Sequence, residues 1–221
     1  MGFVIGLINQ KGGAGKSALA QLIASGYALL SDPWNVKIAD LDPQGTSVDW
    51  CTERNRHSQE PYIAVQSYAR VEDALKEADL YDLIILDTQG DRDSRPTGKT
   101  LRTAKVCDAI VIPTRPNYPD FRIAAKTALL LQDHGIDPFK IIIVINQSTG
   151  DNLVLEGQDY FKGAGFYVCE GHLPLRDTYA RALGYGLSPL EVHVSSLRDK
   201  AQTVFQSIDS RIAAIIERSS T

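Results

Sequence analysis

Short apolar stretches alternate along the chain with longer stretches in which apolar residues recur every three or four positions. Two of the short stretches, Leu83–Leu86 and Ile141–Ile145, are apolar at every position. Such continuous runs are expected of strands that are buried on both faces of a parallel sheet. The longer stretches have the spacing of helices that cover a sheet. The pattern therefore predicts an α/β fold, with a mostly parallel twisted sheet of seven or eight strands flanked by helices.

The individual elements follow from the same pattern. Strands are expected at Phe3–Ile8, Val36–Asp40, Ile63–Val65, Leu83–Asp87, Ala109–Pro113, Lys140–Asn146 and Phe166–Cys169. Helices are expected at Lys16–Leu30, Thr46–Arg54, Val71–Ala78, Thr97–Lys105, Asp120–His134, Asn152–Phe161, Asp177–Leu183 and Ser196–Arg218. The last helix has an apolar stripe, and its polar face mixes acidic with basic residues. Membrane-surface helices carry a mainly basic polar face, so docking against the sheet is favoured and no stable membrane association is expected.

Composition narrows the class of protein. A chain of 221 residues is long enough for one α/β domain with a sizeable core, and we expect a single domain spanning residues 1–221. The net charge of −4 argues against wholesale coating of nucleic acid, although a local basic stripe is compatible with it. The three cysteines lack metal-ligand spacing, and no stretch reaches the ~20 apolar residues of a membrane span. We therefore expect a cytoplasmic protein with reduced thiols.

A glycine-rich segment, Lys11-Gly-Gly-Ala-Gly-Lys-Ser17, lies between the first predicted strand and the first predicted helix. Glycines let backbone N–H groups turn toward an anion, and the helix N-terminus adds partial positive charge. Lys16 would reach the β- and γ-phosphates of a nucleotide, and the Ser17 hydroxyl would bind Mg²⁺. The residues expected to contact ATP here are Lys11, Gly12, Gly13, Ala14, Gly15, Lys16, Ser17 and Ala18.

The start of this loop departs from the common P-loop. Five residues before Gly15, where the common loop has a glycine, this chain has Gln10, and a second lysine, Lys11, follows it. The arrangement resembles the deviant Walker-A loop of the ParA/MinD family of ATPases. The resemblance implies that Lys11 reaches across an ATP-bound homodimer to the nucleotide of the other subunit.

Two acidic motifs follow predicted strands, where side chains face the ligand crevice of an open α/β sheet. Asp87 ends an apolar strand, which is the Walker B pattern, and such an aspartate orients Mg²⁺-bound water or Ser17. The segment Asp40-Leu-Asp42-Pro-Gln is similar to one in the ParA family. That similarity implies that Asp42 orients the attacking water and that Asp40 supports Mg²⁺ through its hydration shell. The expected metal site is thus Ser17, Asp40 and Asp87, and the expected catalytic residues are Lys11, Lys16 and Asp42.

The segment after Asp87 departs from the family pattern, because Gln89 and Gly90 stand where many relatives carry two prolines. A glycine still suits a loop that moves with the γ-phosphate, and the polar stretch Asp91–Gly98 is expected to be the moving part.

Two further positions are candidates for nucleotide contacts. Asn146 ends a predicted strand near the expected base pocket, and its amide can both donate to and accept from adenine; alternatively it caps the next loop. The resemblance implies a nucleotide contact near Pro174. It also places the proline-rich stretch Pro113–Pro119 near the nucleotide and the dimer face. The alternative role of this stretch is a rigid connection between a strand and a helix that is capped by Asp120.

The family resemblance also implies non-specific DNA binding by the ATP-bound dimer. Lys99, Arg102 and Lys105 recur every three residues on one predicted helix, although a solvated face is the ordinary role of such a stripe. The similarity further implies DNA or dimer contacts from Arg176 and Arg181. A second basic set lies on the last helix and consists of Arg198, Lys200, Arg211 and Arg218.

The resemblance covers nearly the whole chain and implies an ATP-dependent DNA-segregation (partition) ATPase of the short ParA type. Its hydrolysis would be slow without a centromere-binding partner protein, and the protein would be nucleoid-associated in the cytoplasm. Two alternatives stay open. One is a MinD-like membrane or cargo-positioning ATPase, and the other is a P-loop metabolic ligase or kinase.

Overall fold

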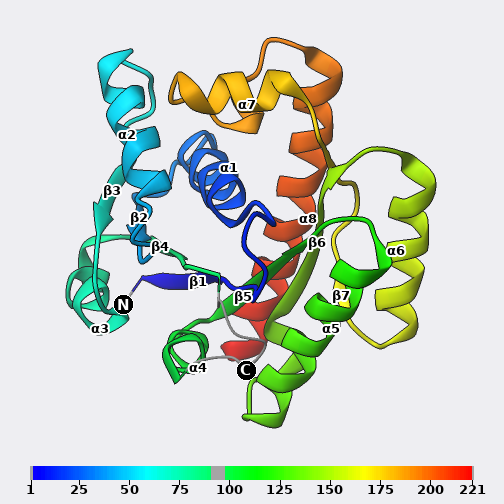
Figure 1. Cartoon of the computed structure of the whole chain (residues 1–221). Helices are drawn as coiled ribbons and strands as arrows, with labels where there is room; N and C mark the ends of the chain where they lie inside the picture. Colours follow the sequence, from blue (N-terminus) through cyan, green and yellow to red (C-terminus); the bar gives the residue numbers. More distant parts are fainter. Residues whose placement is uncertain (1, 91–97, 221) are drawn as a thin grey trace.

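The structure is a computed structural model that describes residues 2–90 and 98–220. In this part of the chain eight strands form a sheet in which every pairing is parallel (Figure 1). The strand order is β3-β2-β4-β1-β5-β6-β7, and β8 pairs with β6. The strands are β1 Phe3–Leu7, β2 Val36–Asp40, β3 Ala64–Ser67, β4 Leu83–Asp87, β5 Ala109–Thr114, β6 Ile141–Ser148, β7 Tyr167–Val168 and β8 Leu173–Pro174. The predicted parallel α/β architecture is confirmed.

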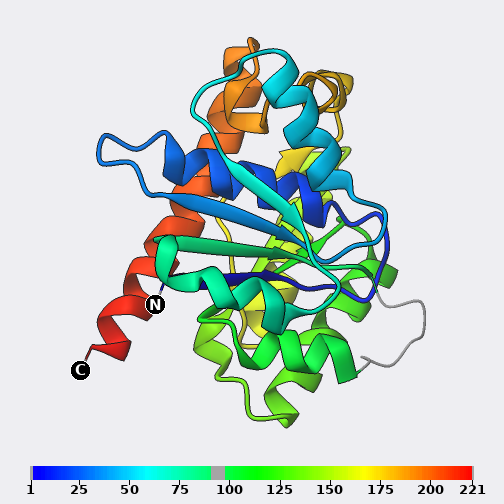
Figure 2. The same cartoon turned by 90° about the vertical axis from the view of Figure 1, so that its left-hand side faces the viewer.

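Helices cover both faces of the sheet, as Figure 2 shows from the side. The α-helices are α1 Lys16–Ala28, α2 Thr46–Arg56, α3 Val71–Ala74, α4 Gly98–Lys105, α5 Tyr118–Asp133, α6 Asp151–Gly163, α7 Asp177–Gly184 and α8 Ser195–Ser219. Short 3₁₀ segments are η1 Leu75–Leu80, η2 Pro138–Lys140 and η3 Pro189–Glu191. Buried side chains of α1, α2, α7 and α8 pack on one face of the sheet, and those of α3, α4, α5 and α6 pack on the other.

The apolar runs of the sequence become the central strands. β4 is fully buried and pairs with β1 on one side and β2 on the other, so its side chains contact helices on both faces. This register places Asp40 beside Asp87 and brings Asp87 beside Leu7. The carboxyl ends of β1, β2 and β4 therefore meet, which is the edge where ligands bind in open α/β sheets.

Several boundaries differ from the sequence prediction for local reasons. The helix predicted over Val71–Ala78 is split into α3 and the 3₁₀ segment η1. The helix predicted from Asp120 begins two residues earlier, because the Asn117 side chain accepts a hydrogen bond from the Asp120 N–H and caps α5. β8 was not predicted, since two residues carry no detectable pattern.

The terminal helix α8 docks on the sheet as predicted. Val204, Phe205, Ile208, Ile212 and Ile215 of its apolar stripe are buried, while Ile216 is 38% exposed rather than part of the core. Among the described residues, no helix has the length and apolarity needed to cross a bilayer.

Candidate functional site

The glycine-rich segment forms the turn between β1 and α1. Gly15 immediately precedes the helix and has φ +89°, a left-handed conformation that side chains rarely adopt. A Cβ atom at this position would lie 2.0 Å from the Asn146 amide nitrogen. Glycine is therefore required at this turn for two independent reasons, and the N–H groups of the first turn of α1 are left facing the crevice.

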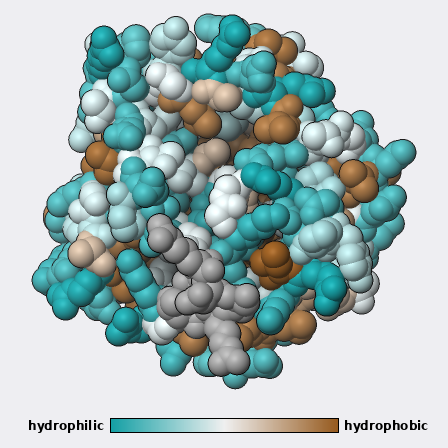
Figure 3. Space-filling model, viewed as in Figure 1, coloured by the Kyte–Doolittle hydropathy of each residue, from teal (hydrophilic) through white to brown (hydrophobic). Residues whose placement is uncertain are grey.

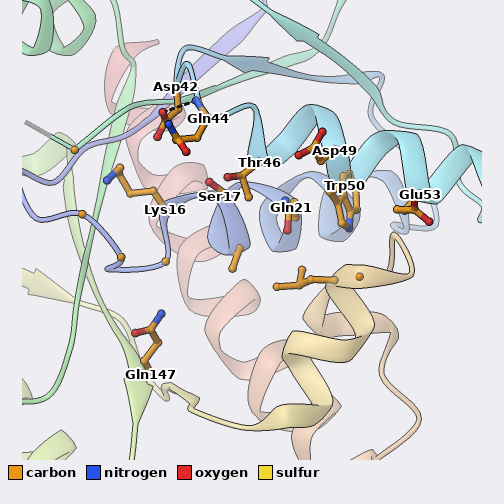
Figure 4. A pocket seen from close by; sticks show the side chains of 17 residues that line it. Lys16, Ser17, Gln21, Asp42, Gln44, Thr46, Asp49, Trp50, Glu53 and Gln147 are labelled. Carbon is orange, nitrogen blue, oxygen red and sulfur yellow. Dashed lines mark hydrogen bonds between the residues drawn. The ribbon is translucent and has the colours of Figure 1, made fainter.

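A cavity of about 530 Å³ opens in front of this turn (Figure 4). It is bounded by the phosphate loop, the start of α1, the loop after β2, and parts of α2 and α7. The predicted site residues that line it are Gly12, Gly13, Gly15, Lys16, Ser17, Ala18 and Asp42. This volume suits a nucleotide, since small-molecule pockets range over roughly 300–1,000 Å³.

Lys16 is buried at 7% exposure although it carries a charge. Its Nζ lies 3.5 Å from the Lys11 carbonyl oxygen at the start of the loop. The ammonium group is thus held over the loop, beside the N–H groups that would face an anion.

The carboxyl group of Asp87 lies below this loop and is 1% exposed. Burial raises its pKa to about 6, and the neighbouring Asp40 adds to this rise, while the Ser17 and Ser47 hydroxyls and Lys16 lower it. The Ser47 hydroxyl donates to Asp87 Oδ2 at 2.8 Å, whereas Asp87 Oδ1 is buried with no hydrogen-bond partner. A buried carboxylate oxygen without a partner, next to a serine hydroxyl, has the donor chemistry that a hydrated Mg²⁺ uses.

The residues present therefore fit a Mg²⁺ ion held jointly with nucleotide phosphates. Among the described residues there is no cluster of three or more histidine, cysteine or acidic side chains that would hold a metal alone. Mg²⁺ is commonly bound through one or two protein oxygens together with phosphates and water.

Asp40 has a structural task in this arrangement. It is fully buried and accepts backbone N–H bonds from Asp42 at 3.0 Å, Ser47 at 3.0 Å and Val48 at 3.2 Å. Burial raises its pKa, and these hydrogen bonds lower it in part. Asp40 thereby holds the start of α2 and the loop that carries Asp42, and its predicted support of Mg²⁺ stays a prediction.

Asp42 lies on this loop at the edge of the cavity, close to Gln44 (Figure 4). Its Oδ1 accepts the Gln44 N–H at 2.9 Å, and its carbonyl oxygen accepts the Gly45 N–H at 2.9 Å. The carboxylate is thus fixed in a tight turn while it still faces the crevice, as a group that orients water must be.

The segment between β5 and α5 holds the phosphate loop from outside the cavity. Arg115 donates to the Gly13 carbonyl oxygen at 2.6 Å, and Asn9 donates to the Pro113 carbonyl oxygen. Lys11 forms an ion pair with Asp120 in the first turn of α5. The predicted proximity of this proline-rich segment to the loop is thus seen, and Lys11 is bound within its own chain in this structure.

Asn146 lies against the phosphate loop. It is 4% exposed and does not line the cavity, and its amide donates to the Ala14 carbonyl oxygen at 2.9 Å. The next residue, Gln147, lines the cavity with φ +57°, and its Oε1 accepts from Arg115 Nε at 2.6 Å. Asn146 supports the phosphate loop here, so contact with the base stays a prediction for which Gln147 is the better-placed side chain. Pro174 is buried in β8 and does not line the cavity.

Several residues that line the cavity were not predicted as site residues from the sequence. They are Gln21, Gln44, Thr46, Asp49, Trp50, Glu53, Gln147, Leu183 and Gly184, and Gly90, expected to belong to a moving loop, also lines the cavity. Gln21 was detectable, because it follows Ser17 by one helical turn. Leu183 and Gly184 were not, since they reach the cavity from α7, far along the chain.

The residues predicted to contact DNA do not form one surface. Lys99, Arg102 and Lys105 are exposed on α4, and Arg176 and Arg181 are exposed at α7, at the opposite end of the molecule in Figure 1. On α8, Arg211 lies 3.7 Å from the centroid of the Phe139 ring and Arg218 pairs with Asp137, so both contribute to packing. Residues 91–97 of the predicted moving segment lie outside the described part of the chain.

Comparisons with known proteins find similar chains in sequence and in fold. No family model matches the chain. The chain is 27% identical over 198 residues to the Maintenance of carboxysome distribution protein A of Gloeobacter kilaueensis, covering 89% of this chain and 88% of that protein. It is 24% identical over 196 residues to the protein of the same name from Halothiobacillus neapolitanus, covering 86% and 88%.

Solved structures share the fold at lower identity. A ParA family ATPase from Chlorobium tepidum has a TM-score of 0.68 at 20% identity, covering 93% of this chain and 98% of that one. The MinD cell division protein of Aquifex aeolicus has a TM-score of 0.72 at 15% identity, covering 94% and 97%. A putative plasmid partition protein of Borrelia burgdorferi bound to AMPPNP has a TM-score of 0.72 at 15% identity, covering 96% and 100%.

The fold is that of P-loop ATPases of the ParA/MinD type, and the phosphate loop carries two lysines, Lys11 and Lys16, as in the deviant Walker-A pattern. In sequence the chain is similar to the carboxysome-distribution proteins over most of its length, and in fold it is similar to ParA/MinD-type ATPases.

Proposed function

We propose that this protein is a nucleotide-switched positioning ATPase of the ParA type. Mg²⁺-ATP joins two copies, the joined pair binds DNA without sequence preference, and a partner protein that binds the cargo, such as a centromere-binding protein, accelerates hydrolysis and releases the pair. The observation that carries this proposal is the pair of lysines at both ends of one phosphate loop, Lys11 and Lys16, in front of a nucleotide-sized cavity.

In this proposal each group at the site has one role. The N–H groups from Gly12 to Ala18 and the Lys16 ammonium bind the phosphates, and Ser17 with Asp87 holds Mg²⁺, which neutralises charge on the phosphates when bound. Asp42 accepts a hydrogen bond from the attacking water and orients it toward the γ-phosphate. Hydrolysis then gives ADP and phosphate, slowly in the absence of a partner.

Lys11 supplies the link between the two copies. It is partly exposed at the mouth of the loop, and its ammonium is held by Asp120. Transfer of this ammonium to the phosphates of a second copy exchanges one anionic partner for another, which offsets the cost of breaking the pair with Asp120.

The relatives in sequence and the neighbours in structure suggest different cargoes for the proposed ATPase. The putative plasmid partition protein among the structural neighbours supports DNA segregation. The relatives in sequence are carboxysome-distribution proteins, and they favour a protein cargo as the second candidate. The buried apolar stripe of α8 argues against a membrane-bound version, because the face that would enter a bilayer is packed in the core.

An electrophoretic shift on random-sequence DNA with ATP, ADP or no nucleotide tests the proposal. We expect a shift with ATP alone, and we expect Lys11→Ala to bind ATP as a monomer and to lose the shift. Lys16→Ala should lose ATP binding altogether, whereas the matched variant Lys162→Ala, exposed at the end of α6, should behave as wild type.

Equal DNA binding in all nucleotide states would contradict the DNA switch. Sedimentation with liposomes and ATP would identify the membrane alternative. Rapid turnover with a small-molecule acceptor and no response to DNA would identify a metabolic enzyme.

A further inference from the structure

A second cavity, also of about 530 Å³, lies along α5 and is closed on one side by α6. Its walls are mainly apolar, with Pro119, Ile123 and Leu129 on α5 and the rings of Tyr118 and Tyr160. Tyr118 is 64% exposed and Leu129 is 52% exposed, which is unusual for two large side chains on one short surface. We call this cavity the α5–α6 groove.

The groove is built on a fixed aromatic frame. Phe121 stacks on Tyr160 with 5.9 Å between ring centroids and meets Phe161 edge-on at 5.6 Å. Tyr118 contacts Tyr160 at 6.2 Å. Because these rings hold each other in place without any ligand, a molecule that enters the groove does not have to order its walls.

The charge around the groove has one sign. Arg122 and Lys126 line it, are exposed, and follow each other by one helical turn on the same face of α5. Within residues 2–90 and 98–220 neither side chain has an ion-pair partner, and no acidic residue lines the groove. The arrangement complements an apolar surface that carries carboxylates.

We propose that the α5–α6 groove binds a short amphipathic segment of a partner protein. Apolar side chains of that segment fill the space between Tyr118, Leu129 and Tyr160, and its carboxylates pair with Arg122 and Lys126. A short segment fits better than a broad surface, because hydrophobic side chains on the mostly hydrophilic face in Figure 3 emerge only in small separate spots.

The α5–α6 groove lies next to Asp120, the residue that holds Lys11. Tyr118 and Pro119 directly precede Asp120, which pairs with Lys11 in the phosphate loop. A partner bound here lies beside the first turn of α5, so it is adjacent to the group that holds Lys11. Docking itself does not depend on the proposed function, since it needs neither ATP nor a second copy.

Selection from a displayed library of random peptides, about 16 residues long, on the immobilised full-length protein tests the proposal, since this length covers a helical groove. We expect enriched peptides to combine leucine or phenylalanine at helical spacing with aspartate or glutamate. In fluorescence anisotropy their affinity should fall about tenfold or more in Leu129→Glu and in Arg122→Glu/Lys126→Glu, as expected for central and charge-paired contacts. Leu129→Ser is a second variant that adds no charge, and it should lower the affinity by less than Leu129→Glu.

The matched control is Leu155→Glu on α6, where a leucine of 59% exposure does not line the groove. This variant should keep the affinity within about twofold, as surface changes outside an interface do. Failure to enrich any peptide, enrichment of basic peptides, or equal loss in Leu155→Glu would overturn the proposal. Self-association of the nucleotide-free protein that Leu129→Glu abolishes would also overturn it, since the occupant would then be a second copy.

Discussion

Lys11 and Asp120 lie 109 positions apart in sequence and form an ion pair that ties the phosphate loop to the first turn of α5. Asp120 is 3% exposed, whereas Lys11 is 36% exposed. The second carboxylate oxygen of Asp120 is buried without a hydrogen-bond partner. The Lys11 ammonium therefore compensates the negative charge of this buried carboxylate. The ion pair in turn restrains Lys11, the lysine that would act between subunits.

Substitution Asp120→Asn should favour the ATP-bound dimer. The amide keeps the size of the side chain and removes the charge that holds Lys11, so less free energy is needed to move the lysine to a second copy. We expect half-maximal dimerisation at about fivefold lower protein concentration with Mg²⁺-ATP, which is in the ordinary range of coupling free energies. Analytical ultracentrifugation measures this shift.

The matched control for this prediction is Asp133→Asn, an exposed carboxylate at the other end of α5. It should leave dimerisation unchanged. Unchanged dimerisation in Asp120→Asn as well would mean that the Lys11–Asp120 pair does not restrain assembly.

Gly90→Ala should weaken ATP binding without unfolding the protein. A Cβ atom at Gly90 would lie 3.0 Å from the Gly12 nitrogen and 3.2 Å from the Lys11 carbonyl carbon, so the added methyl group presses on the backbone of the phosphate loop. We expect the dissociation constant for ATP to rise about tenfold, corresponding to the 1–3 kcal/mol of a modest overpacking. Isothermal titration calorimetry measures it.

Gly163→Ala, in the last turn of α6, is the control, because a Cβ atom added there would meet no neighbouring side chain or loop of the described residues within 4 Å. If Gly90→Ala binds ATP as tightly as Gly163→Ala, the contact between the segment after β4 and the loop has no influence on the nucleotide site.

Local chemistry explains why one side of the site was predictable from the sequence. Gly15, Lys16 and Ser17 act within a single strand–loop–helix unit, so their spacing along the chain fixes their positions in space. Asp87 was found in the same way, at the end of a strand too apolar to lie anywhere except in the middle of the sheet.

The remaining walls depend on packing between distant elements. Gln147 lines the cavity whereas Asn146 donates to the Ala14 carbonyl group, and the sequence alone favoured the asparagine for the base. The partner of Lys11 was not predicted, since an ion pair across 109 positions has no local pattern. Arg211 looked like a surface cation, but the ring of Phe139 covers it.

Asp87→Asn should stabilise the nucleotide-free protein above pH 6. Burial raises the pKa of Asp87 from 3.8 to about 6, so the folded protein keeps a proton that the unfolded chain loses between these values. Stability therefore falls as the pH rises from about 4 to 6 and then levels off, at a cost of about 3 kcal/mol from this group. The amide removes this cost, and the same substitution should weaken Mg²⁺-dependent ATP binding.

Thermal melts of wild type and Asp87→Asn in EDTA, between pH 4 and pH 8, measure the effect. The difference in melting temperature should grow through the window from pH 4 to 6 and stay constant above it, by roughly 2–4 °C for each kcal/mol. Asp159→Asn, an exposed carboxylate on α6, should show no such trend. A constant difference across the whole range would mean that Asp87 is ionised throughout.

Asp42→Ala should separate binding from hydrolysis. Asp42 lines the cavity on a turn fixed by Asp40, and its proposed partner is the attacking water rather than the phosphates. We expect ATP binding and dimerisation to persist while turnover falls about a hundredfold or more, in the range of lost general-base or water-positioning groups. Unimpaired phosphate release in a coupled assay would exclude this role.

The basic face of α4 should contribute more to DNA binding than the arginines of α7. Lys99 and Arg102 are exposed and border a small cavity with Arg70 and Glu72, and Arg70 is paired with Asp73, so the positive charge there comes from α4 itself. Arg176 and Arg181 are separated from it by the length of the molecule (Figure 1).

We therefore expect Lys99→Glu/Arg102→Glu to abolish the ATP-dependent shift on random DNA and Arg176→Glu/Arg181→Glu to retain it. Single neutral substitutions give a quantitative check. Each phosphate contact contributes about −0.9 to the slope of the logarithm of the DNA association constant against the logarithm of the salt concentration. A dimer carries every contact twice, so Lys99→Gln should reduce the slope by up to about 2. An unchanged slope in Lys99→Gln, with a reduced slope in Arg181→Gln, would move the DNA surface to α7 and make the stripe on α4 an ordinary solvated face.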